Sequence, residues 1–335
     1  MRFFAVILLI GLLVIAGCAD MQTETDRDTK NGAYGQVINV VTTIYPLADI
    51  VSELGGERVN VSYLMPAGAS PHTYEPTVEQ AREVSQAHLF IHIGAGLDNW
   101  AVDLAKAAEP GPELLDLSQV VDLIESAGYR TVEHDDHEEH LDCDHNHDHD
   151  CDQDHDHDCD HDHGPDDPHY WLDPIMVRDE ICPAISGQFA SIDREGKGYY
   201  EGRLNNYQDE LTDLHKDIEA AVSGFSYQGF ISFHSAWQYF GQRYGLKEVA
   251  VVAQFPGQEP SAGWLAELIG IIREENISAI FAEPQFPVAL AERIAEESGI
   301  DVKIIDPLGG EGVTGRESYL EMMRFNLAAF EEAMQ

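Results

Sequence analysis

The sequence predicts an α/β protein with two lobes, each a parallel sheet flanked by helices, joined by one long helix. Three observations support this fold class. Short β-rich runs alternate with helical segments in both halves of the chain, and one long amphipathic segment separates the halves. The chain of 335 residues is 44% hydrophobic, enough for two cores of ordinary size. Because open parallel sheets bind ligands beyond the carboxyl ends of their strands, we expect the functional site in the cleft between the lobes.

The N-terminus has the features of a secretory signal. Arg2 is followed by an apolar run, residues 3–15, that is too short to span a bilayer comfortably. The run ends in Ala-Gly-Cys, which resembles the lipobox of prokaryotic lipoproteins. We expect residues 1–17 to be a signal peptide and Cys18 to carry a lipid; the alternatives are an ordinary signal or an uncleaved anchor. Polar residues 18–35 then form a flexible tether. The folded part is therefore expected outside the cytoplasm, anchored at the outer face of the cell membrane, on the cell surface or in the periplasm.

Residues 36–192 are predicted to form the N-terminal lobe. Strands are expected in the β-rich runs at residues 36–43, 58–65 and 88–94. Helices are expected at residues 46–54 and 77–86. A loop rich in His, Asp and Cys, residues 133–167, interrupts this lobe.

Residues 193–223 are predicted to be the linking helix. Apolar residues recur every three or four positions with charged residues between them, which indicates one buried face. These residues are Tyr200, Leu204, Tyr207, Leu211, Leu214, Ile218 and Val222. At 1.5 Å per residue the segment would extend about 45 Å, long enough to cross the whole molecule.

Residues 224–335 are predicted to form the C-terminal lobe. Four strands are expected, at residues 229–234, 248–255, 278–284 and 301–306. Helices are expected between them, at residues 261–276 and 287–299.

The net charge of −42 makes polyanionic partners unfavourable. Nucleic acid is excluded on this ground, whereas cations are favoured. A saline habitat is an alternative explanation for the general acidity.

The loop contains a unit of eight residues written three times from Leu141 to Gly164. It offers imidazoles, carboxylates and thiols but almost no apolar side chains for a core, so it is expected to be disordered on its own. We expect it to gather or sense Zn²⁺ near the cleft; the alternative is a solvated acidic spacer. The candidate auxiliary ligands are His134, His137, His140, Cys143, His145, His147, His149, Cys151, His155, His157, Cys159, His161 and His163. The remaining cysteine, Cys182, lies in an apolar stretch and is expected to be a core thiol.

Six histidines lie outside the repeat. His88, His92 and His215 are interpreted as structural or surface residues. His72 and His169 lie in proline-containing loops, and His234 ends a predicted strand. Because carboxyl ends of parallel strands share one edge, these side chains are expected to face a common crevice.

Asp306 ends another predicted strand and would add a carboxylate to the three imidazoles. Three nitrogens and one oxygen form a tetrahedral set suited to Zn²⁺, whereas Mn²⁺ would favour a second carboxylate. His234 is therefore the residue that discriminates between the two metals. Glu283, at the end of a further strand, is expected to form a hydrogen bond beside the site, with direct ligation as the alternative.

The motifs TTIYPLADI, PAGASPHTYEP, DPHYWLDP, SFHSAWQYF, EPSA, FAEPQ and IDPLGG occur in this order between residue 37 and the C-terminus. In combination they resemble the cluster A-I metal-binding proteins of ABC transporters, in particular the zinc-uptake branch. The resemblance implies two α/β lobes on a rigid helix with the metal in the cleft. By position, His72, His169 and His234 match the three zinc histidines of the family, and Asp306 matches its carboxylate. The cysteines of the loop depart from the usual His/Asp/Glu composition.

The predicted function is therefore a binding protein, not an enzyme. It would capture Zn²⁺ and deliver it to a membrane permease driven by an ATPase. Manganese or iron binding is the alternative within this class, and a zinc hydrolase is the alternative from another class. The hydrolase is disfavoured because no H-E-x-x-H, G-x-S-x-G or P-loop motif occurs. A surface adhesin or metal store is a third possibility.

Overall fold

The computed structural model describes residues 37–127, 166–253 and 260–335, which belong to a single unit of the chain, Tyr34–Gln335. The predicted signal, lipid and tether (1–35) and the His and Cys residues of the repeat lie outside the described residues.

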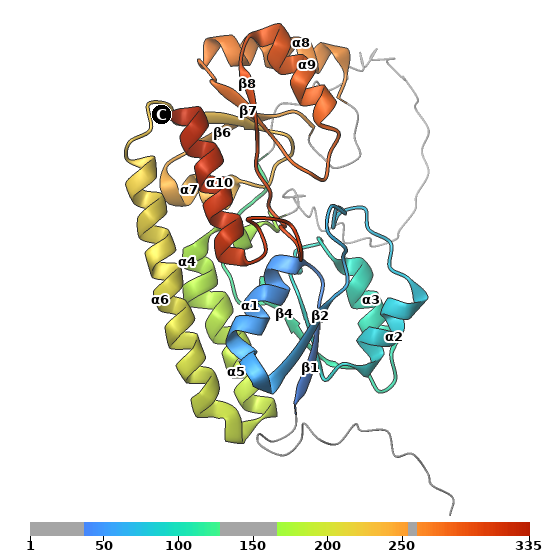
Figure 1. Cartoon of the computed structure of the whole chain (residues 1–335). Coiled ribbons are helices and arrows are strands. Elements are labelled where there is room, and N and C mark those ends of the chain that lie inside the picture. Colours follow the sequence, from blue (N-terminus) through green and yellow to red (C-terminus); the bar gives the residue numbers. More distant parts are fainter. Residues whose placement is uncertain (1–36, 128–165, 254–259) are drawn as a thin grey trace, which may run out of the picture. The chain divides into compact units, whose positions relative to one another are not determined.

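The N-terminal sheet has four parallel strands in the order β2-β1-β3-β4. Figure 1 labels β1, β2 and β4 of this sheet. The strands are β1 (Ile38–Thr42), β2 (Val59–Tyr63), β3 (Leu89–His92) and β4 (Glu113–Asp116). Helices α1 (Tyr45–Gly55), α2 (Val78–Gln86) and α3 (Asn99–Ala107) connect them. The three expected strands are confirmed, and β4 is an additional strand at the edge.

The C-terminal sheet repeats this plan with the order β6-β5-β7-β8, again all parallel. Its strands are β5 (Gly229–Ser232), β6 (Lys247–Val251), β7 (Ala279–Ala282) and β8 (Asp301–Ile304). Its helices are α7 (Gln238–Tyr244), α8 (Ala262–Glu274), α9 (Val288–Ser298) and the C-terminal α10 (Tyr319–Met334).

Both sheets reverse their strand order at one point, between β1 and β3 and between β5 and β7. At such a point the connections leave a crevice beyond the carboxyl ends of the two strands. His234 lies two residues after β5 and Glu283 directly after β7, so these two side chains flank the switch point of the C-terminal sheet.

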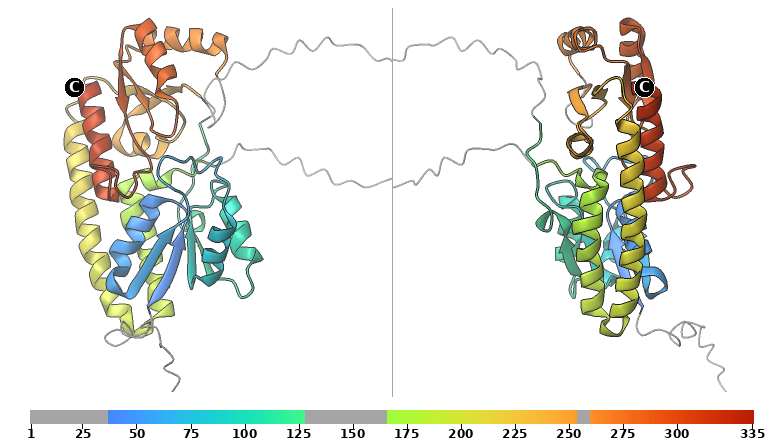
Figure 2. Two further views of the ribbon diagram at one scale, coloured as in Figure 1. Left: turned by 45° about the vertical axis from the view of Figure 1, so that its right-hand side comes forward. Right: turned by 90° about the vertical axis from the view of Figure 1, so that its left-hand side faces the viewer.

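The long helix α6 (Lys197–Val222) is preceded by a 3-10 turn, Arg194–Gly196, close to the predicted start. Its buried residues Tyr200, Tyr207, Leu211, Leu214 and Ile218 belong to the predicted apolar face. It contacts α1 and α5 (Cys182–Ile192), and also α7 and α10 (Figure 2). The prediction of one helix joining two lobes is thus confirmed. None of the helices in the described residues is long and apolar enough to cross a membrane.

The largest hydrophobic cluster extends under both sheets. Alternate strand residues point to opposite faces, so Val40 and Phe230 enter this cluster while their neighbours Val41 and Ile231 enter smaller ones. One smaller cluster lies under α2 and α3, and the other under α8 and α9. Because the shared cluster includes α6 and α10, the two sheets are held on a continuous apolar core.

Candidate metal centre

Three histidines that are far apart in the sequence meet in one cluster. One ring nitrogen from each of His72, His169 and His234 lies within 4.8 Å of the others. Nε2 of His72 and Nε2 of His169 are 3.3 Å apart. The ring centroids are separated by 5.3 to 5.8 Å in all three pairs. The structure therefore brings together the three imidazoles that the sequence analysis singles out.

The loop that carries His72 is held from outside the cluster. Trp100 of α3 donates its Nε1–H to the carbonyl of Pro71 at 3.1 Å. Its ring also packs edge-on against Tyr74, with centroids 5.1 Å apart. These contacts fix the loop on both sides of His72.

His169 is oriented by a carboxylate two residues earlier. Asp167 Oδ1 lies 2.7 Å from His169 Nδ1 and also accepts the backbone N–H of His169 at 2.9 Å. Asp167 is buried, and its backbone is held by the Ile124 carbonyl and the Tyr239 hydroxyl. Asp167 is not among the site residues expected from the sequence, because it falls at the end of the predicted loop, residues 133–167. The motif Asp167-Pro168-His169 is visible in the sequence. Its two-residue spacing allows the carboxylate of Asp167 to contact the ring of His169.

His234 is oriented in the same way from another strand. Glu283 Oε1 lies 2.8 Å from His234 Nδ1, and both side chains are buried. Burial by itself lowers the pKa of His234, but the negative charge of Glu283 and its hydrogen bond raise the pKa above its ordinary value. The hydrogen-bonding role expected for Glu283 matches this contact. Its second oxygen, Oε2, has no hydrogen-bond partner among the described residues.

Both contacts use Nδ1, so Nε2 is the ring nitrogen that His169 and His234 can offer to a metal ion. A carboxylate on Nδ1 fixes the tautomer and the ring orientation and makes Nε2 more basic. This arrangement of carboxylate and histidine is common behind zinc ligands in proteins.

His72 is the member of the cluster that is exposed, although its ring faces the other two. Loss of hydration, followed by repulsion from His169 and His234, lowers the pKa of His72 to about 2. A neutral imidazole is the form that binds metal ions.

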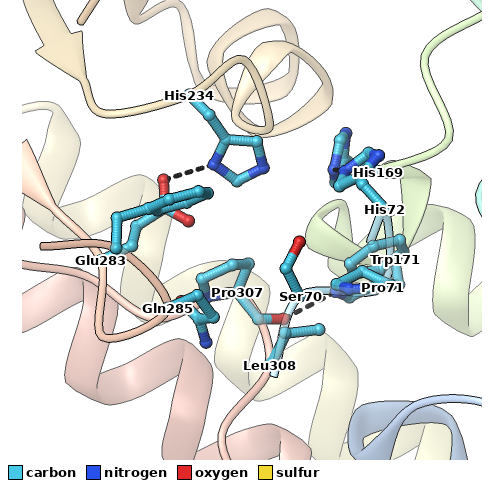
Figure 3. Close-up of a pocket in the computed structure, with 11 residues that line it drawn as sticks. Ser70, Pro71, His72, His169, Trp171, His234, Glu283, Gln285, Pro307 and Leu308 are labelled. Carbon is cyan, nitrogen blue, oxygen red and sulfur yellow. Dashed lines mark hydrogen bonds and ion pairs between the residues drawn. The ribbon is translucent and has the colours of Figure 1, made fainter. Parts of the chain in front are cut away.

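The histidines line one pocket (Figure 3). The remaining lining residues come from both lobes and are Ser70, Pro71, Trp171, Glu283, Gln285, Phe286, Pro307 and Leu308. Trp171 Nε1 donates to the Pro307 carbonyl at 2.8 Å, and the ring of Phe286 lies 5.1 Å from that of His234. The wall around the imidazoles is thus largely apolar, which strengthens electrostatic interactions inside it.

Asp306, the expected fourth ligand, is not part of the group of three histidines whose nitrogens lie within 4.8 Å of one another. The residue follows β8 as predicted and is buried, but its carboxylate has other partners. Oδ2 forms an ion pair with Arg316 at 2.8 Å. Oδ1 accepts hydrogen bonds from Gln285 Nε2 and Leu308 N, both at 3.0 Å.

The other histidines of the described chain have structural contacts, as expected. His88 Nδ1 accepts the backbone N–H of Asn39 at 2.9 Å. His92 is buried beside Asp98, and His215 on α6 contacts Glu219 and Tyr244. Cys182 is a buried free thiol whose pKa is raised by desolvation, in agreement with a core position.

Comparison with known proteins gives a consistent result. Residues 40–333 match the family model described as "Zinc-uptake complex component A periplasmic". The chain is 29% identical over 328 residues to the high-affinity zinc uptake system protein ZnuA of Bacillus subtilis (strain 168), covering 96% of this chain and 94% of that protein. It is 25% identical over 335 residues to the manganese-binding lipoprotein MntA of Halalkalibacterium halodurans, covering 98% and 96%. Its fold matches a crystal structure of ZnuA with a TM-score of 0.73 and 27% identity, covering 90% of this chain and all of that one.

Proposed function

Because this chain belongs to the family of the zinc-uptake complex component A, the solute-binding component of ABC zinc transporters, we propose that His72, His169 and His234 capture Zn²⁺ for delivery to the permease. The observation that carries the proposal is the convergence of three imidazole nitrogens, two of them on rings oriented by buried carboxylates.

The spacing of the nitrogens suits zinc. Two nitrogens that are each about 2.0–2.1 Å from a tetrahedral ion are separated by about 3.3 Å. The Nε2 atoms of His72 and His169 are 3.3 Å apart. One ring nitrogen of His234 lies within 4.8 Å of those of the other two histidines and would be the third nitrogen ligand.

The donor set favours zinc over manganese. Mn²⁺ prefers oxygen ligands, and the cluster offers three nitrogens. A hydrolase would need a general base beside the metal. The two carboxylates beside the cluster, Asp167 and Glu283, are each engaged with Nδ1 of a histidine, which supports binding and release of the ion over hydrolysis.

The attachment of the protein and the role of the loop are further parts of the proposal. Cys18 would carry the lipid that holds the protein at the outer face of the membrane, where the permease and its ATPase form the rest of the transporter. The His, Asp and Cys residues of the repeat would gather zinc at a high local concentration near the cleft.

The experiment compares zinc titration by calorimetry for the wild-type protein and a His234→Ala variant. A His215→Ala variant is the matched control, because His215 lies on α6 outside the pocket. The tight zinc site should be lost only in His234→Ala. Cells with His234→Ala as their only copy should take up less radioactive zinc when zinc is limiting. Equal tight binding by His234→Ala and the wild type would contradict the proposal.

A deletion of residues 133–163 separates the contribution of the loop from that of the cleft. The deletion must stop before Asp167, because this residue orients His169. Glu125 and Asp166, which lie on either side of the deleted segment, form a backbone bridge that the deletion leaves in place. The shortened protein should keep one tight zinc site. It should bind fewer zinc ions in total than the wild type and support slower zinc uptake when zinc is limiting.

A further inference from the structure

The two ends of the chain on either side of residues 128–165 meet in the structure. Glu125 and Asp166 form an antiparallel backbone bridge, and Asp167 N donates to the Ile124 carbonyl at 2.8 Å. We call residues 124–127 and 166–167 the stem. Because Asp167 belongs to the stem and also orients His169, the position of the stem affects a proposed zinc ligand.

One hydroxyl from the C-terminal lobe joins both ends of the stem. Tyr239 of α7 accepts a hydrogen bond from Ile124 N at 3.1 Å and donates to the Asp167 carbonyl at 3.0 Å. Its side chain is buried, and its ring lies edge-on to that of Tyr170 with the centroids 6.3 Å apart. Loss of the hydroxyl would therefore remove the partner of a donor on one end and of an acceptor on the other.

A neighbouring amide holds the first end of the stem at two further points. Gln238 Oε1 accepts from Ala127 N, and Gln238 Nε2 donates to the Glu125 carbonyl, both at 2.9 Å. We call Gln238 and Tyr239 the clamp. Because α7 begins shortly after His234, the clamp ties the segment that carries His169 to the segment that carries His234.

We propose that the clamp keeps the stem closed against the chain entropy of residues 128–165 and thereby holds His169 in place beside the other two imidazoles; this role rests on the proposed zinc function. Gln238 and Tyr239 do not line the pocket, so they are positioning residues. Such a role predicts that zinc binding depends on the clamp only while the long connection is present.

The force that opposes the clamp grows with the length of the connection. Holding the two ends of a segment together costs entropy that rises with the number of residues between them. The deletion of residues 133–163 leaves about a fifth of the connection, which favours the closed stem by about 10-fold. One intramolecular hydrogen bond stabilises by a comparable factor, about 2- to 12-fold. The four hydrogen bonds of the clamp are therefore strong enough to decide whether the stem is closed.

The chain after His169 is held independently of the stem. Asp173 is buried and pairs with Arg243 of α7, whose Nη2 lies 2.7 Å from Oδ2. Asp173 Oδ1 also accepts from Ile175 N at 2.9 Å at the start of the short helix α4 (Pro174–Met176). Opening of the stem would therefore displace the residues before His169 and leave those after it in place, which turns the imidazole away from its partners.

The first test measures zinc affinity in four proteins: the wild type, the clamp variant Gln238→Met/Tyr239→Phe, the deletion of residues 133–163, and the two changes combined. Titration against a competing chelator reports the tight site. The clamp variant should bind zinc about 10-fold more weakly, as expected if its stem is closed in about one molecule in ten. The deletion alone should leave the affinity unchanged, and the combined protein should recover it to within about threefold.

Tyr244→Phe is the matched control, because it removes a hydroxyl from the same helix that contacts His215 instead of the stem. It should bind zinc as the wild type does, with or without residues 133–163. Wild-type affinity in the clamp variant would overturn the inference. Equally weak binding by the clamp variant with and without residues 133–163 would also overturn it, because the clamp would then be a general structural contact. Absence of a tight site from the wild type would contradict the proposed zinc function itself.

The second test follows the stem without zinc. Hydrogen exchange of the amides of Ala127 and Asp167 is measured in the metal-free Tyr239→Phe variant, in which both amides keep their own acceptors. Both should exchange about 10-fold faster than in the wild type, and the deletion of residues 133–163 should restore slow exchange. Unchanged protection in Tyr239→Phe would overturn the inference. This single change keeps the buried ring, so the test decides even if the clamp variant does not fold.

Discussion

The carboxylate of Asp167 lies 2.7 Å from Nδ1 of His169, two positions along the chain. The same relationship joins Glu283 to His234, although those residues are far apart in the sequence. Two of the three imidazoles in the cleft are therefore oriented by buried carboxylates, one local and one brought by a neighbouring strand.

Asp167→Asn should weaken zinc binding about 10- to 100-fold without removing a ligand, because the amide carries no charge to increase the basicity of His169. The measurement is calorimetric titration with zinc. Asp166→Asn is the matched control, since this neighbouring acid is exposed and should bind zinc as the wild type does. Equal affinities for Asp167→Asn and the wild type would show that the contact has no influence on the metal.

Glu283→Gln should lower the pKa of His234, because Glu283 is the group that raises it against the effect of burial. NMR titration of the His234 ring in the metal-free protein measures this change. A raised pKa in the folded protein stabilises it at low pH, and this contribution is lost as the pH rises through the folded-state value. Zinc binds only the neutral ring. Because the pKa of His234 is higher in the wild type than in Glu283→Gln, protons compete with zinc up to a higher pH in the wild type.

Without the carboxylate, Nε2 of His234 is a less basic ligand, so the zinc affinity of Glu283→Gln should be weaker than that of the wild type. The difference should be largest at high pH, where protons no longer compete with zinc in the wild type. Glu267→Gln, at an exposed position on α8, should leave both the titration of His234 and zinc binding unchanged. A pKa of His234 that stays the same in Glu283→Gln would exclude the ion pair as its cause.

Asp49→Asn should stabilise the protein near neutral pH. Desolvation raises the pKa of Asp49 from 3.8 to about 6, so the folded state disfavours the ionised form. Between pH 3.8 and about 6 the folded protein binds more protons than the unfolded protein does. The free energy of unfolding therefore falls as the pH rises through this range. Asparagine removes this penalty and can still accept the hydrogen bond from Tyr319 N. We expect a gain of about 1–3 kcal/mol near pH 8.

Urea unfolding at several pH values measures this effect. The difference between Asp49→Asn and the wild type should shrink as the pH falls from about 6 and level off below 3.8, where the carboxyl is protonated in both states. Asp217→Asn, at an exposed position on α6, should show no such dependence. A constant difference at all pH values would rule out titration of Asp49 as the origin.

Phe330→Ala should destabilise the protein by about 3–5 kcal/mol, because Phe330 is fully buried on α10 where the shared core meets the C-terminal sheet. Its ring centroid lies 4.5 to 5.7 Å from those of Phe230, Trp237, Phe240 and Phe281. Chemical denaturation provides the measurement, with the exposed Tyr227→Ala as control. A loss below about 1 kcal/mol would mean that the core collapses around the cavity.

The periodic elements could be predicted from the sequence alone. The apolar face of α6 recurs every three or four residues, and the central strands are short apolar runs, so local pattern and burial agree. β4 gives no such signal, since it is an edge strand with Glu113 and Leu114 exposed. The C-terminal helix α10 is likewise absent from the expected elements, although its apolar residues enter the core.

The sequence by itself determined which imidazoles are available for metal: histidines at strand ends or in proline-containing loops outside the repeat. Only the tertiary structure decided how each is used. The pairing of His234 with Glu283 depends on the adjacency of β5 and β7. Capture of Asp306 by Arg316 depends on a turn that folds ten residues back on themselves. Residue type and position decide whether a side chain can bind a metal, but the partners that the folded chain brings beside it decide how it is oriented.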